Sequence, residues 1–263
     1  MILSDRYRFV FIHIPKCAGT SVRAAVLPYH DADLRFLKTV ERHPDLGEID
    51  FRHLPLALLR DLDPEAFEKL KTYAGYAILR DPFQRFRSAV SQRTKMYLGK
   101  EFAQLSQADI DTEIDRVITY LQSEPRVIAP EFIHFARQLD FVQLEGERLV
   151  HNLYPVERLD LLVAALSQKI GVGALEIGHA NKTKVLRHPQ LKHVLYKGSA
   201  IARRVLPATM YEGLRVSARR MLMKSNDTAQ PSDFGGKPVR DFIQSHYADD
   251  IAMHKEILAK MAT

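Results

Sequence analysis

A short run of small and polar residues, Pro15-Lys16-Cys17-Ala18-Gly19-Thr20-Ser21, has the residue types needed to bind a phosphate group. Small residues let backbone N–H groups approach an anion, and hydroxyl groups donate hydrogen bonds to it. Lys16 adds a positive charge. A triphosphate-binding loop places its lysine after a second glycine, whereas Lys16 precedes the lone Gly19. The run therefore predicts a phosphate site of another kind, with a tight turn and a solvated lysine as the alternative.

A second group of residues with the same potential is Arg80-Asp81-Pro82, followed by Arg85 and Ser88. A guanidinium offers a planar fork that matches a phosphate, and a serine hydroxyl can add a further donor. Asp81 can cap a helix that begins at Pro82. The pattern predicts a second anion site, and a capped helix with an ordinary surface arginine is the alternative.

Both groups lie where a predicted strand leads into a predicted helix. Residues 7–14 and 75–79 are rich in β-branched and aromatic types, which is typical of buried strands. Further elements are a helix from Asp63-Pro64 to about Tyr73, a strand over 149–157 and a helix up to Gly171. This order predicts an α/β fold, a P-loop-like three-layer α/β/α sandwich with a central parallel sheet. Ligands of such sheets bind outside the carboxyl ends of the strands, so both turns should lie at one edge.

The remaining chain is predicted to complete a single domain over residues 1–263. Residues 107–138 read as two helices separated near residues 123–130, which contain Pro125 and Pro130. A stretch rich in Pro, Gly, Ser and Asp at about 225–238 predicts a mobile loop. A final helix is expected over about 238–260.

The composition is that of a soluble globular protein, with 46% hydrophobic and 27% charged residues in 263. Its single cysteine, Cys17, excludes an intrachain disulfide and a multi-cysteine zinc cage and suits a reducing compartment. The apolar runs are too short for a membrane span or a secretory signal, so a cytoplasmic location is expected. We expect no metal site, and no nucleic-acid partner, because basic and aromatic residues do not interleave.

Positive charge is concentrated in one segment of the chain. The net charge is +6, and residues 180–225 contain eleven Lys or Arg residues but one acid, Glu212. Such a segment attracts anions. It could meet an acidic acceptor, an anionic membrane surface with peripheral attachment, or another subunit, and it could also be a solvated helical face.

Together the two turns resemble a known enzyme family. FIHIPKCAGTS is similar to the 5′-phosphosulfate-binding loop of sulfotransferases, and ILRDPFQRFRSAV to their 3′-phosphate-binding motif. The order is similar to that of carbohydrate sulfotransferases related to heparan sulfate 2-O-sulfotransferase and their bacterial relatives. The resemblance covers residues 7–92. It implies 3′-phosphoadenosine 5′-phosphosulfate (PAPS) as donor, the desulfonated nucleotide PAP as product and a hydroxyl of a carbohydrate or glycolipid as acceptor.

The same resemblance implies roles for individual residues. The 5′ end of the donor would be held by the loop residues, and the 3′-phosphate by Arg80 and Ser88. The segment HANKTK resembles a late loop that closes over the nucleotide, which would add Lys182 and Thr183. The loop residues in question are Lys16, Cys17, Ala18, Gly19, Thr20 and Ser21. Lys16 would also stabilise the negative charge that develops on the leaving phosphate.

Transfer to a hydroxyl also needs a base, and His53 is the expected one. It lies between the two motifs, where the related glycan enzymes carry a catalytic histidine, and a neutral imidazole can accept a proton near pH 7. A packing histidine is the alternative reading, and the reserve bases are Glu48, Asp50 and His43.

Two nearby residues are expected to take no part in the chemistry. Cys17 sits in an electropositive loop at a helix start, where a thiol pKa should fall, yet sulfuryl transfer needs no thiol. His13 lies on the apolar strand and is expected to be a core histidine.

Two other functions remain open from the residues alone. An ATP-dependent small-molecule kinase could also use a strand, a phosphate loop and a helix, although the order of glycine and lysine argues against it. The other is a non-catalytic module that binds anions or membranes through residues 180–225.

Overall fold

The structure, a computed structural model, describes residues 1–37, 40–177, 184–186, 223–225 and 234–261. The chain divides into two compact units, one formed by Met1–Gly178 with Pro231–Thr263 and the other by His179–Gln230. In the second unit, β9 (Lys184–Leu186) pairs antiparallel with β10 (Met223–Ser225). The rest of the basic segment, including Lys182 and Thr183, lies outside the described residues. The single-domain assignment therefore stays a prediction.

A sheet with strand order β1-β2-β5-β8 forms the centre of the first unit. Its strands are β1 (Ile2–Ser4), β2 (Phe9–Ile12), β5 (Ala74–Leu79) and β8 (Asn152–Pro155). β2, β5 and β8 run parallel, as predicted, while β1 is an antiparallel edge strand that was not expected. The parallel strands bring the residues after β2 and β5 to the same edge of the sheet.

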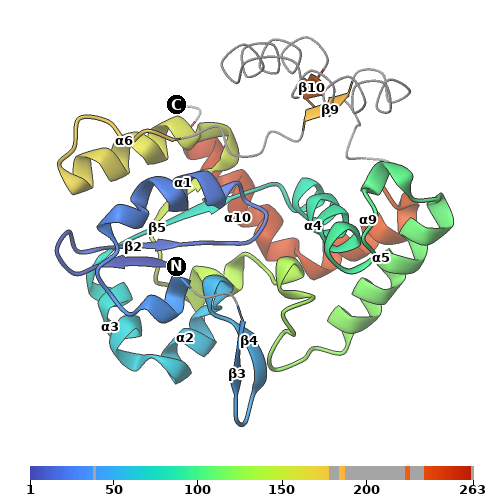
Figure 1. The fold of residues 1–263 in the computed structure, drawn as a ribbon, viewed down its shortest axis with the longest axis horizontal. Coiled ribbons are helices and arrows are strands. Elements are labelled where there is room, and N and C mark those ends of the chain that lie inside the picture. The colour runs from blue at the N-terminus through green and yellow to red at the C-terminus, as the bar shows by residue number, and fades with distance from the viewer. Residues whose placement is uncertain (38–39, 178–183, 187–222, 226–233, 262–263) are drawn as a thin grey trace, which may run out of the picture. The chain divides into compact units, whose positions relative to one another are not determined.

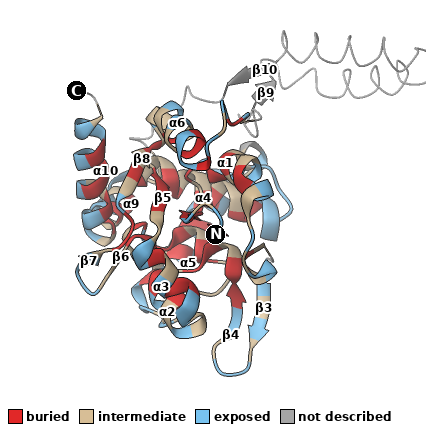
Figure 2. Cartoon of the chain, turned by 90° about the vertical axis from the view of Figure 1, so that its left-hand side faces the viewer, coloured by how far each residue is buried: buried red, intermediate tan, exposed pale blue. Residues whose placement is uncertain are grey.

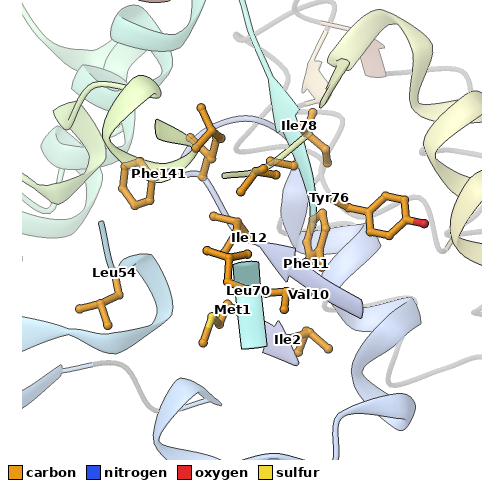
Figure 3. Packing of buried hydrophobic residues seen from close by; sticks show 14 of the residues in the cluster. Met1, Ile2, Val10, Phe11, Ile12, Leu54, Leu70, Tyr76, Ile78 and Phe141 are labelled. Atoms are coloured by element: carbon orange, nitrogen blue, oxygen red, sulfur yellow. The ribbon is translucent and has the colours of Figure 1, made fainter. Parts of the chain in front are cut away.

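Helices cover both faces of this sheet. In Figure 1, α1 (Gly19–Val26) and α6 (Leu159–Ile170) lie above it, and α2 (Leu56–Leu62) and α3 (Pro64–Thr72) lie below. The four residues of β2 are at most 3% exposed, so this strand is buried from both sides. Figure 3 shows its side chains in the core with those of Leu70 and Phe141. The predicted three-layer α/β/α architecture is confirmed.

Local sequence signals set the starts of two helices as expected. The Asp63 carboxylate accepts a hydrogen bond of 2.9 Å from Ala66 N at the start of α3. The Asp81 carboxylate accepts one of 2.9 Å from Gln84 N at the start of α4 (Pro82–Tyr97). Each satisfies an N–H group that has no partner inside its helix, and the proline that follows each aspartate fits the first helical position.

The segment 107–138 differs from the prediction. Its first part is α5 (Gln107–Gln122), but the second is a loop with a 3₁₀ turn at Ile133–Phe135. Two buried arginines of α4 bind its carbonyl oxygens. Arg93 Nη1 lies 2.8 Å from Glu131 O, and Arg85 Nη1 lies 3.2 Å from His134 O. These two carbonyl oxygens accept hydrogen bonds from α4, so they do not need the N–H partners that a helix would supply.

The C-terminal helix is also different from the prediction, because it is broken in two. α9 (Gly236–His246) and α10 (Ala248–Lys260) meet at Tyr247. This side chain is buried, and its hydroxyl donates a hydrogen bond of 2.7 Å to Phe135 O. α4, α5 and α9 share a second apolar cluster, beside the sheet in Figure 1. The predicted loop over 225–238 lies mostly outside the described residues.

Two small hairpins were not expected from the sequence. β3 (Val40–His43) pairs with β4 (Gly47–Asp50), and β6 (Gln143–Leu144) pairs with β7 (Glu147–Arg148). The first projects from the helices with its tip exposed (Figure 2). β4 leads into a 3₁₀ turn, Phe51–His53, which carries the predicted base.

Candidate active site

The first phosphate turn follows β2 and begins α1. Lys16 and Ala18 have φ values of 65° and 58°, in the left-handed region that non-glycine residues seldom occupy. Ala18 is the N-cap of α1 and forms no side-chain cap, and the first turn holds no acidic residue. The positive end of the helix is therefore not neutralised by a side chain of its own first turn. This is the arrangement of an anion site.

Gly19 is needed for close packing at this helix start. A Cβ atom added at Gly19 would lie 2.5 Å from Cδ2 of His13, closer than any real contact. The ring of His13 is buried, as expected of a core histidine, and it lies directly under the turn. Thr20 is exposed and Ser21 is half-buried on the same turn.

Lys16 and Arg80 lie close together, although they belong to different turns. Arg80 Nη1 is 3.3 Å from Lys16 O, and Lys16 Nζ is 3.5 Å from Gln92 Oε1. Burial, together with the charge of Arg80, lowers the pKa of Lys16. In the described part of the chain neither cation forms an ion pair with a carboxylate. The structure holds two half-buried cations side by side, which favours the binding of an anion.

One face of α4 runs along these cations. Gln84 Oε1 is 3.5 Å from Arg80 Nη2, and Gln92 contacts Lys16. Ser88 lies one helical turn from each of them, on the same face. The structure thus places Ser88 between a residue that touches Arg80 and a residue that touches Lys16. Gln92 was missed at the sequence level, although its spacing of four from Ser88 could have indicated it.

The Cys17 side chain points away from this site. Its thiol is buried and lies 3.2 Å from Gln138 Oε1. Burial raises the pKa of Cys17 to about 12. The expectation that the electropositive loop lowers this pKa is wrong, because the loss of solvent outweighs the nearby arginines. Cys17 can contribute its backbone to an anion site, while its thiol serves the packing of the turn.

His53 lies next to the end of β2. Its Nδ1 is 2.8 Å from His13 O, and because a carbonyl oxygen only accepts hydrogen bonds, Nδ1 carries the proton. Nε2 is then the nitrogen that can accept a proton. The ring of His134 is centred 5.7 Å away. Burial lowers the pKa of His53 to about 3, so the ring is neutral at pH 7.

The three reserve bases are less suitably placed. Asp50 is buried, and its carboxylate accepts a hydrogen bond of 2.9 Å from Arg52 N and pairs with the Arg52 guanidinium. His43 Nδ1 accepts a hydrogen bond of 3.2 Å from Asp45 N in the β3–β4 turn. Glu48 is exposed on the hairpin. Asp50 and His43 are therefore already engaged in hydrogen bonds with neighbouring residues.

The buried histidines should make the protein sensitive to acid. Burial lowers the pKa values of His53 and His134 from 6.5 to about 3. Between these values the unfolded chain binds protons that the native chain does not, so the free energy of unfolding falls as the pH drops. Each histidine contributes at most about 1.4 kcal/mol per pH unit. Urea unfolding of the wild type and of His53→Gln at pH 6.5 to 4.5 should show the shallower dependence in the variant; identical slopes would contradict the assignment.

A family comparison places this geometry in a known enzyme class. The model of the family described as "Sulfotransferase family" matches residues 1–146, which is more than half of the chain and includes both turns, His53 and α4. The chain belongs to the sulfotransferase family. No curated protein and no solved structure gives a match. The sulfotransferase has no helix among its described residues that is long and apolar enough to cross a membrane.

The match also indicates the sulfuryl donor. Sulfotransferases generally take the sulfuryl group from PAPS and release PAP. In the described part of the sulfotransferase, no group of three or more His, Cys, Asp or Glu side chains is arranged to hold a metal ion.

Proposed function

We propose that the protein transfers the sulfuryl group of PAPS to a hydroxyl of a carbohydrate or glycolipid. The observation that carries the proposal is the pair of cations, Lys16 and Arg80, held together at the start of α1 without a carboxylate partner among the described residues. The resemblance of both turns to those of carbohydrate sulfotransferases supports the class of acceptor. The buried thiol of Cys17 suits a reducing compartment, and we place the reaction in the cytoplasm.

The residues present fit an adenosine bisphosphate. Among the described residues, the start of α1 has no side-chain cap and the buried Arg80 Nε has no hydrogen-bond partner, so both have donors left for an anion. Lys16 and the backbone of residues 17–21 would hold the 5′ end, and Arg80 with Ser88 the 3′-phosphate. Bound PAPS supplies a sulfuryl group whose sulfur bonds to the acceptor oxygen as its bond to the 5′-phosphate breaks.

The chain's own groups would handle the proton and the charge. His53 Nε2 accepts the proton of the acceptor hydroxyl, while its Nδ1–H is fixed by His13 O. Burial keeps the His53 ring neutral at pH 7, which a base requires. The Lys16 ammonium donates hydrogen bonds to the oxygen that leaves, and its lowered pKa makes it a stronger donor.

A transfer assay tests the proposal directly. The protein is incubated with PAPS labelled in its sulfuryl group and a panel of neutral glycans, acidic glycans and glycolipids. We expect label on at least one acceptor together with stoichiometric release of PAP. Label on a glycan places the acceptor among carbohydrates and label on a lipid among glycolipids; no transfer to any member, by protein that binds PAP, would overturn this acceptor class.

Arg80→Ala should weaken the binding of PAP by about 10- to 100-fold, since a charge-assisted contact to a phosphate contributes about 1.5–3 kcal/mol. The binding of adenosine 5′-monophosphate, which lacks the 3′-phosphate, should change much less. Titration calorimetry with both nucleotides measures the difference. Arg87→Ala, in the second turn of α4, is the matched control. Equal weakening of both nucleotides would contradict the role of Arg80 at the 3′-phosphate.

A further inference from the structure

Gln138 is a buried residue that the sequence did not single out, and it binds the backbone of Arg80 at two points. Its side-chain Oε1 accepts a hydrogen bond of 2.9 Å from Arg80 N, and its Nε2 donates one of 2.9 Å to Arg80 O. The residue is 0% exposed. This pairing is what a neighbouring strand would provide, and it continues the backbone order of β5 for one residue beyond Leu79.

The same side chain also binds the other phosphate turn. Gln138 Oε1 lies 3.2 Å from Cys17 Sγ, so one carboxamide bridges the residue after Lys16 and the backbone of Arg80. Cys17 and Gln138 are 121 residues apart in sequence. The groups that Gln138 binds, the Cys17 thiol and the Arg80 backbone, are uncharged, and neither is a side-chain cation proposed to hold a phosphate. The bridge therefore uses neither the Lys16 ammonium nor the Arg80 guanidinium, the two groups proposed to bind the nucleotide.

Gln138 is itself held firmly from α10. Its backbone N donates a hydrogen bond of 2.7 Å to Asp250 Oδ2, and Leu139 N donates one of 2.9 Å to Asp250 Oδ1. Asp250 is 1% exposed, and its Oδ2 lies 4.0 Å from Nη2 of the buried Arg85. Buried polar groups of this kind resist movement, because any displacement leaves a donor or acceptor without a partner. The bridge is therefore anchored on a buried network of hydrogen bonds.

We propose that Gln138 is the positioning residue that sets the separation of the two phosphate turns. This inference rests on the proposed function, in which one nucleotide is held at both ends. A ligand with two charged ends gains from both sites only when their separation matches its own length, whereas a ligand with one charged end does not depend on it. If Gln138 only supported the fold, its replacement would weaken the binding of nucleotides with one phosphate group as much as the binding of PAP, which has two.

The test compares three ligands on two variants. Wild type, Gln138→Leu and Gln138→Asn are titrated with PAP, adenosine 5′-monophosphate and adenosine 3′-monophosphate. Asparagine keeps the amide but is one methylene too short to bridge, and it is the variant of choice if Gln138→Leu does not fold. Gln244→Leu, on an exposed position of α9, is the matched control.

We expect both Gln138 variants to bind PAP about 10- to 100-fold more weakly and to bind each monophosphate within about twofold of wild type. Parallel losses for all three nucleotides, or unchanged PAP binding, would overturn the inference. Wild type that binds PAP no better than the monophosphates would instead overturn the proposed function, so the two failures are distinguishable.

Gln138→Glu tests the two hydrogen bonds to the Arg80 backbone by a change of pH. A protonated carboxyl group has the same donor and acceptor as the amide, so it can donate to Arg80 O and accept from Arg80 N. An ionised one cannot donate. The charged residues around position 138 are Arg80 and Asp250, which bind its side chain and its backbone N, and Arg85, which lies beside Asp250. The ratio of PAP affinities between this variant and wild type should rise as the pH is lowered from 8 to 5.5; a constant ratio would contradict the bridge.

Discussion

Replacing His53 by alanine is expected to lower kcat by about 10²- to 10⁴-fold, the usual contribution of a positioned base. The affinity for PAP should stay within about twofold of wild type, because His53 contacts His13 O and adjoining rings but neither Lys16 nor Arg80. Initial rates of sulfate transfer and calorimetry with PAP measure the two effects separately.

His53 is buried, so its removal will also lower stability, and the controls must account for this. His53→Asn keeps a side-chain donor near His13 O but supplies no basic nitrogen, and it should be as inactive as His53→Ala. His43→Ala removes a half-buried histidine at the end of β3 and should retain full activity. Full activity in folded His53→Ala would show that His53 is not the base. Inactivity of His43→Ala would indicate that His43, on the β3–β4 hairpin, is needed for transfer.

Lys16→Ala should lower kcat by about 10²- to 10³-fold, the range observed when one preorganised donor to a developing negative charge is removed. PAP binding should weaken as well, since half of the cation pair is lost. Because Lys16 is held at a left-handed φ of 65°, its ammonium position is set by the turn as much as by its own contacts. Lys16→Arg therefore should not restore the rate, although it restores the charge.

Lys95→Ala is the matched control for this experiment. Lys95 lies on α4, the helix that carries Gln92, but its ammonium pairs with Glu101 at 3.0 Å and is exposed. We expect it to have wild-type kinetics. A Lys16→Ala variant with unchanged kcat and a raised KM alone would show that Lys16 binds the donor without assisting the departure of the phosphate.

Local signals were sufficient to predict the elements that carry the two turns. The buried strand ending before Pro15, the Asp63-Pro64 start and the Asp81-Pro82 start all follow from neighbouring residues, and all three are present. Parallel pairing of β2 with β5 then places Lys16 and Arg80 at one edge of the sheet. That the two turns share one edge could be predicted, because it follows from the parallel direction of the strands.

Contacts between distant parts of the chain could not be predicted in this way. The pKa of Cys17 depends on its burial beside Gln138, and no local pattern marks a glutamine in an irregular loop as its partner. The break at Tyr247 depends likewise on a carbonyl of Phe135. Arg85, which the sequence grouped with Arg80 and Ser88, is buried and binds the loop that holds Gln138.

Calorimetric titration of the wild-type protein with PAP and, separately, with ATP and Mg²⁺ tests the central claim most directly. The cations of the two phosphate turns should bind PAP, and Lys16→Ala and Arg80→Ala should each weaken that binding, while ATP with Mg²⁺ should give no comparable signal. Tight binding of ATP with Mg²⁺ and none of PAP would contradict the account and favour a kinase.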